Sequence, residues 1–171
     1  MAEKDTTAAG LALAKDPERG RLAVGSSRYL LIRPETLVPL AGSGDPGVQA
    51  LLEEGGFRGG RLAGRAGLAQ GLKDRAAVER VLAFGALIGW GRFRVEWDGP
   101  AVVLEHSPFA EACAPSERPV CHLVRGVLRG IWSEVMGSNV PWEEPACAAC
   151  GAPACRFVPA KGTGGGGGSL R

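Results

Sequence analysis

Four of the five cysteines lie in or just around one stretch, Pro119–Phe157, with acidic residues between them. A closed metal site requires such a group, because zinc takes about four ligands from Cys sulfur, His nitrogen and Asp or Glu oxygen. The C-x-x-C spacing in this stretch suggests a zinc knuckle formed by Cys121, Cys147, Cys150 and Cys155. A single C-x-x-C is weak evidence, since cysteines are also buried as small apolar residues, and Cys150 is also compatible with an exposed turn. The stretch predicts a metal site and leaves its ligands open.

Length and composition are those of a single globular domain. With 171 residues, 45% of them apolar, the chain can bury a sizeable core without staples. The 20 basic and 18 acidic residues leave a net charge of +2, which gives no electrostatic reason to bind nucleic acid or an anionic membrane. Aromatic residues are few, so stacking platforms for single strands are not indicated either. Nucleic acid is therefore not expected as a partner.

No segment has the features of a membrane anchor or a secretory signal. The apolar runs fall short of the roughly 18 residues that a membrane helix needs. The beginning of the chain mixes acidic and basic side chains with short apolar steps, unlike a signal peptide. We therefore expect a cytoplasmic protein. Cysteines there are more often metal-binding or reactive than disulfide-bonded, and the odd count of five agrees.

Composition divides the chain into three parts. Residues 1–20 are rich in alanine and charge without a clear period, which predicts a flexible lead-in or a frayed helix. Residues 160–171 contain a run of glycines and predict a disordered tail. A single domain is expected between them, over residues 21–159.

Hairpins alternate with helices in the predicted domain. Asp98-Gly99, between alternating apolar residues, is a strong hairpin signal. Strands are predicted at 21–24, 28–33, 93–97, 101–106, 140–147 and 154–158. Helices are predicted from 46, from 74 and over about 118–136, with a loop at 107–117. Because strands that return through short turns imply an antiparallel sheet, the predicted class is α+β, an antiparallel sheet of short hairpins packed on one side by helices.

The helix predicted after Asp45 is unusually rich in glycine. Asp45 is a good N-cap, and Pro46 suits the first turn. Glycines then recur over residues 55–67, each lowering helix stability by about 1 kcal/mol relative to alanine. A kinked helix, or a break near Gly55, is the favoured interpretation. The alternative is that the glycines allow another helix or a ligand to approach closely.

The last part of the chain resembles a known family. Cys121 stands at a helix start, Gly126 and Gly130 follow, an acidic residue stands three before Cys147, and the run closes with residues 151–157, Gly-Ala-Pro-Ala-Cys-Arg-Phe. This order resembles the 4-vinyl reductase domain, which closes with Gly-Asp-x-x-Cys-Arg-Phe; alanine replaces the aspartate here. The family is a small-molecule-binding module of bacteriochlorophyll biosynthesis proteins and of bacterial phenol- and xylene-responsive activators. It is similar in fold to small subunits of the TRAPP tethering complex.

The resemblance implies a ligand set for the metal. In the aromatic-sensing members three cysteines and one glutamate hold a zinc ion, and the matching positions here are Cys121, Glu144, Cys147 and Cys155. Cys150 is excluded, because the family has a small residue at that position. Four protein ligands leave no open position, so the resemblance implies a structural zinc.

The resemblance also implies a pocket between the sheet and the long helix. The expected partner is a small apolar, aromatic or tetrapyrrole-type molecule, and the candidate lining residues are Phe84, Val102, Leu104 and Trp142. Each of them also suits an ordinary core position. In the phenol sensors a Trp near Leu104 and a His on an earlier helix contact the ligand. Neither has a counterpart here, which argues against phenol itself.

Three functions follow from these expectations. The first is a stand-alone sensor or accessory protein, expected to be a homodimer, that binds the small molecule. The second is a reductase of vinyl tetrapyrroles, or its accessory, in chlorophyll or bacteriochlorophyll biosynthesis. Catalysis is the weaker interpretation, because neither a nucleophile–base pair nor a Gly-rich nucleotide fingerprint is evident. The third is a dimerising scaffold with a vestigial or lipid-filled pocket.

Overall fold

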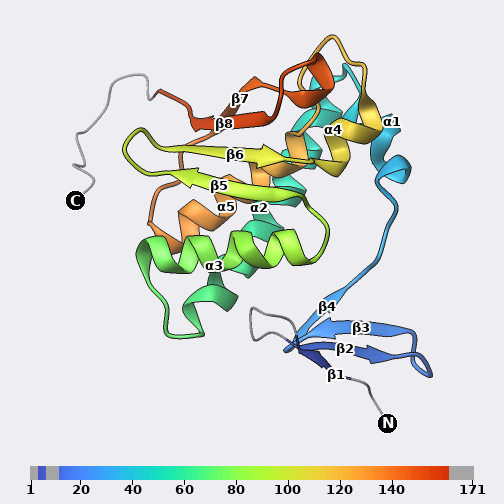
Figure 1. Ribbon diagram of the computed structural model, residues 1–171, viewed down its shortest axis with the longest axis vertical. Coiled ribbons are helices and arrows are strands. Elements are labelled where there is room, and N and C mark those ends of the chain that lie inside the picture. Colours follow the sequence, from blue (N-terminus) through green and yellow to red (C-terminus); the bar gives the residue numbers. More distant parts are fainter. Residues whose placement is uncertain (1–3, 7–11, 162–171) are drawn as a thin grey trace.

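Helices and two antiparallel sheets make up the fold of the computed structural model, which describes residues 4–6 and 12–161 (Figure 1). Each sheet has four strands. This agrees with the predicted class, with the strands divided between two sheets rather than gathered in one. The tail predicted from residue 160 lies, from residue 162 onward, outside the described residues.

The first sheet has the order β1-β2-β3-β4. Its strands are β1 (Lys4–Thr6), β2 (Ala12–Asp16), β3 (Arg21–Val24) and β4 (Ser27–Tyr29). The structure thus differs from the expected lead-in or frayed helix over residues 1–20, because β2 pairs with β3, with Ala14 opposite Ala23. Pairing along the backbone needs no amphipathic pattern, which is why composition did not indicate it.

A connecting segment carries the chain from β4 to the helical body. The strand predicted over 28–33 ends at Tyr29, and the next residues lead to η1 (Pro34–Leu37) and α1 (Val38–Ala41). Figure 1 shows the first sheet set apart from the second sheet at the other end of this segment. Tyr29 contacts the body through an edge-to-face packing with Phe84, with ring centroids 5.7 Å apart.

The glycine-rich helix α2 (Pro46–Leu68) is continuous over 23 residues, so the predicted kink or break near Gly55 does not occur. Its start agrees with the prediction, because the Asp45 carboxylate accepts a hydrogen bond of 2.7 Å from the Gly47 N–H. The helix is held together by contact with α5 (His122–Val135), which it approaches backbone to backbone.

Glycines on both helices make this close approach possible. A Cβ added at Gly60 would lie 2.9 Å from the Cα of Val127, and one added at Gly130 would lie 2.8 Å from the backbone nitrogen of Arg61. Both distances are shorter than real Cβ contacts allow. The alternative interpretation of the glycines, close approach of another helix, is therefore the one that the structure supports.

The second sheet has the order β5-β6-β8-β7. Its strands are β5 (Arg92–Glu96), β6 (Ala101–Glu105), β7 (Trp142–Ala146) and β8 (Cys155–Pro159). The Asp98-Gly99 turn joins β5 to β6 as predicted, with Phe93 opposite Leu104. Strand β8 enters between β6 and β7, so Leu104 lies opposite Cys155.

Two helix boundaries differ from the predictions. The predicted loop 107–117 contains α4 (Pro108–Cys113), which begins where the Ser107 hydroxyl accepts a 3.3 Å hydrogen bond from the Ala110 N–H. Helix α5 begins at His122 rather than near 118, and Cys121 occupies its N-cap position. The Cys121 N–H donates to Glu144 Oε2 at 3.1 Å, so a side chain from β7 takes the place of another helical turn.

The core lies where α3 (Asp74–Leu87) and α5 pack on the second sheet. Its largest fully buried side chains include Val102, Leu104, Leu128 and Phe157. Helix α5 lies between this sheet and α2 in the packing, since it contacts both β7 and α2. Within residues 4–6 and 12–161, none of the helices combines the length and apolar character that a bilayer crossing demands.

Candidate metal centre and ligand core

Four segments of the second half of the chain bring one cluster together. Cys121 is the N-cap residue of α5, Glu144 lies in β7, Cys147 precedes η2 (Ala148–Cys150), and Cys155 begins β8. All four side chains are buried, and their potential ligand atoms lie within 4.8 Å of one another. The structure thus gathers the residues named by the resemblance into a group that is able to hold a metal ion.

The geometry of the cluster suits a tetrahedral ion. The Sγ atoms of Cys121 and Cys155 are 3.7 Å apart, and a tetrahedral zinc site with Zn–S bonds of about 2.3 Å has edges of about 3.8 Å. Glu144 Oε1 is buried and has no hydrogen-bond partner among the described residues. A buried oxygen without a partner is costly unless a cation or a donor reaches it. The donors present therefore fit a metal ion.

Neighbouring groups orient the sulfur atoms. The Ala148 N–H donates to Cys155 Sγ at 3.3 Å, and the Ser107 hydroxyl lies 3.5 Å from Cys121 Sγ. Partners of this kind fix the direction of a metal ligand before the metal arrives.

The metal-free cluster shares few charges among many acidic groups. Burial, and then the charge at Cys147, raises the pKa of Glu144 to about 8. Hydrogen bonds with Cys147 and Cys155 raise the pKa of Cys121 far above its usual value, and hydrogen bonds with Cys121 and Cys155 lower that of Cys147. For Cys155, the hydrogen bond with Cys121 lowers the pKa, but the one with Cys147, together with burial, raises it to about 12. A cation that binds here must displace protons, so its affinity is expected to increase with pH.

The remaining cysteines and histidines lie outside this group. Cys150 is exposed in the turn after Cys147, and Cys113 is half-buried. His106 is 82% exposed. His122 is buried, and its Nδ1 lies 2.6 Å from Arg125 Nη2. Burial, and then the Arg125 charge, lowers the pKa of His122 to about 4, so the ring is neutral at pH 7.

The candidate ligand residues fall into two environments. Val102, Leu104 and Trp142 belong to the buried core that also contains the cluster cysteines. Phe84 is half-buried on α3 and packs against Tyr29 instead. The structure brings three of the four candidates into one core and places Phe84 at its margin.

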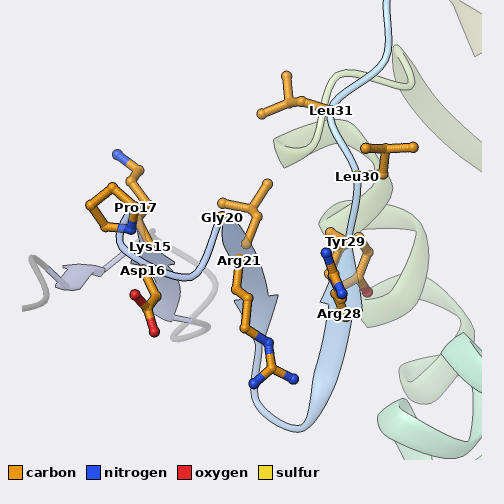
Figure 2. A pocket seen from close by; sticks show the side chains of 10 residues that line it. Lys15, Asp16, Pro17, Gly20, Arg21, Arg28, Tyr29, Leu30 and Leu31 are labelled. Carbon is orange, nitrogen blue, oxygen red and sulfur yellow. The ribbon is translucent and has the colours of Figure 1, made fainter.

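A groove that the sequence did not indicate lies on the first sheet. It has a volume of about 780 Å³ and is open to solvent, with Tyr29, Leu30 and Leu31 on one side. Figure 2 shows these side chains on the segment beside Arg21 and Asp16. None of the candidate ligand residues lines it. The exposed apolar triplet after β4 was the available signal, because Leu30 and Leu31 are 82% and 84% exposed.

Known proteins share the second half of the chain most clearly. Residues 100–160 match the family model of the 4-vinyl reductase (V-4-R) domain, which confirms the resemblance over this segment. A 70-residue segment is 37% identical to the bacteriochlorophyll synthase 23 kDa chain of Cereibacter sphaeroides. That segment covers 40% of this chain and 34% of the relative. The match therefore spans about a third of the length of the curated relative.

Solved structures share the fold. The phenol-responsive sensory domain of the transcription activator PoxR, crystallised with phenol, has a TM-score of 0.74 at 22% identity, over 85% of this chain and 82% of that chain. A vinyl-4-reductase family protein from Methanocaldococcus jannaschii has a TM-score of 0.54 at 18% identity, over 77% of this chain and 82% of that one. At these identities the likeness concerns the fold alone, and the predicted α+β class is confirmed.

Proposed function

We propose that this chain, whose residues 100–160 match the 4-vinyl reductase domain, is a metal-stabilised module that binds a small apolar or aromatic molecule. The observation that carries the proposal is Trp142, which is 3% exposed and whose Nε1 has no hydrogen-bond partner among the described residues. A buried donor left unpaired costs about 1–3 kcal/mol. A ligand oxygen at this nitrogen removes that cost, so the ligand combines an apolar body with a hydrogen-bond acceptor.

Aromatic rings surround this donor. The ring of Trp132 packs edge-on against Trp142 with centroids 4.7 Å apart, and Trp97 lies 6.0 Å from Trp132. Trp97 is half-buried, so the row of indoles runs from the core towards the surface. A flat ring suits such a row, because aromatic pairs prefer edge-to-face or offset contacts at these separations. Val102 and Leu104 supply apolar surface from β6, and Phe84 lies at the margin.

Zinc is the ion that this proposal places at the cluster. Three cysteine sulfurs and one carboxylate oxygen are a zinc donor set, and with all four engaged no position remains for a substrate. Cys121, Glu144, Cys147 and Cys155 would hold the ion. The zinc would join α5 to β7 and β8, and its binding free energy would add to folding stability. Its role is therefore structural.

Two relatives bear on the ligand. The likeness to the PoxR sensory domain, a structure with phenol, supports an aromatic ligand. Phenol itself is not proposed, because its contacts in the phenol sensors lack counterparts in this chain. The match to the bacteriochlorophyll synthase 23 kDa chain favours a second candidate, a tetrapyrrole-type ligand with an accessory or reductase role. The proposal also includes a homodimer and a cytoplasmic location, where the five free cysteines stay reduced.

Native mass spectrometry of the purified full chain, before and after mild denaturation, tests the proposal. We expect about one zinc ion per chain and an additional small molecule that is released on denaturation. The matched variant Trp142→Phe keeps an aromatic ring but loses the donor, so it should retain zinc and lose most of the small molecule. A folded wild-type chain without metal would overturn the metal assignment. Zinc without any ligand, even after incubation with aromatic and tetrapyrrole compounds, would favour the scaffold instead.

A further inference from the structure

Helix α2 carries glycines on two faces, and only one face is explained by the fold. Gly56 and Gly60 lie against the backbone of α5, where a Cβ has no room. Gly55 and Gly59 point away from α5, and a Cβ added at either would meet nothing within 4 Å. Glycine in a helix interior lowers helix stability relative to alanine. The outward pair therefore weakens the helix without serving any contact among the described residues.

The outward glycines lie between exposed apolar side chains. Leu51 is 74% exposed and Leu62 is 64% exposed. The spacing from Leu51 through Gly55 and Gly59 to Leu62 follows successive turns of one helix face. We name this set the outer α2 face. It has the features of the inner contact with α5: small residues that permit close approach, and larger apolar residues beside them.

Charges on the same face complement each other. Glu54 and Arg58 form an exposed ion pair of 2.7 Å within the helix, with side chains 49% and 78% exposed. A helix pair related by a twofold axis near the middle of this face runs antiparallel, and it places Glu54 of each copy beside Arg58 of the other. The same arrangement sets Leu51 opposite Leu62 of the second copy. One symmetric pairing thus satisfies the apolar and the charged residues together.

We infer that the outer α2 face is the contact through which two copies of this chain associate, helix against antiparallel helix. Gly55 and Gly59 let the two backbones approach, as Gly56 and Gly60 do towards α5. The contact lies on the side of α2 away from the metal cluster and the Trp142 core. It specifies the surface of the proposed homodimer, and it fails or holds separately from the binding of metal and small molecule.

Charge reversal tests whether the face meets itself. In Glu54→Arg the face is uniformly basic, and in Arg58→Glu it is uniformly acidic. Each variant alone should dissociate, with a dissociation constant raised by about tenfold or more. An equimolar mixture of the two should restore a heterodimer. Sedimentation equilibrium of the full chains measures both results, and Glu117→Arg, an exposed reversal elsewhere, should leave the dimer unchanged.

A second variant separates folding from association. Gly59→Ala should raise the melting temperature of the monomer, because alanine favours the helix, and weaken the dimer by about tenfold, because the new Cβ enters the contact. Leu31→Asp probes the groove on the first sheet as the competing surface. The inference is overturned by a wild-type chain that stays monomeric at high micromolar concentration, or by charge reversals that leave the dimer intact. A mixture that does not reassociate also overturns it, and loss of the dimer in Leu31→Asp alone would assign the interface to the groove.

Discussion

Adjacent glycines of α2 should respond to the same substitution with opposite sign. In Gly60→Ala the new Cβ meets the Val127 backbone, at 2.9 Å from its carbonyl carbon and closer still to its carbonyl oxygen. Ordinary van der Waals contact begins at 3.4 Å, so α2 and α5 must separate by at least about half an ångström. Overpacking of this kind costs about 1–3 kcal/mol, and the helix gains about 1 kcal/mol from alanine. Because the obstacle is backbone and cannot rotate away, we expect a net loss of about 2 kcal/mol.

Gly59→Ala is the matched control one residue away. Nothing lies within 4 Å of its added Cβ, so the variant keeps the propensity gain of about 1 kcal/mol. The two variants should therefore differ by about 3 kcal/mol in the free energy of unfolding. Urea denaturation followed by circular dichroism measures this difference, at protein concentrations low enough to keep the chain monomeric. A Gly60→Ala protein as stable as Gly59→Ala would show that the helices are not in backbone contact, and the account of the α2–α5 seam would be wrong.

Three further results are expected. Cys155→Ser should lose the bound metal and melt about 10 °C lower, corresponding to about 3 kcal/mol, whereas Cys150→Ser should keep its metal; elemental analysis and calorimetry measure both, and equal metal content would contradict the ligand set. Hydrogen bonds from Arg65 and Arg61 hold the pKa of Glu134 below its usual value, so this carboxylate contributes stability above its unfolded pKa, and the contribution is lost as the pH falls through the lower folded pKa. Melting temperatures between about pH 6 and about pH 3 should therefore fall more steeply for the wild type than for Glu134→Gln, and parallel curves would refute it. Trp142→Phe should weaken the co-purified ligand by about tenfold in a calorimetric titration, and unchanged affinity would remove Nε1 from the proposed site.

Local signals predicted the parts of the fold whose chemistry is local. Asp98-Gly99 specifies a tight turn by its backbone preference, and the β5–β6 hairpin follows. Asp45 followed by Pro46 marks the start of α2 because both residues act within one turn. The side chains of the cluster were chosen by resemblance rather than by spacing, and the structure brings the same four residues together. Their role as metal ligands stays a prediction.

Tertiary contacts decided the parts that were missed. The continuity of α2 depends on Gly126 and Gly130, which lie far away in the sequence, so propensity alone indicated a break. The start of α5 depends on Glu144, which takes the Cys121 N–H from another strand. Strands β1 and β2 depend on pairing with β3 rather than on a pattern of their own. In each case the partner group lies outside the window of neighbouring residues on which a local prediction depends.

The backbone contact between α2 and α5 also determines how a displacement on one side of the molecule reaches the other. Side chains in an ordinary helix interface change rotamer and absorb a small displacement, but a glycine seam has no side chain to rotate. Arg125, one turn into α5, contacts His122 next to the cluster and also pairs with Glu53 on α2. The two helices therefore behave as one stiff plate, and a shift at Cys121 is transmitted to the far side of α2. Occupation of the interior in this way changes the outer surface of the protein.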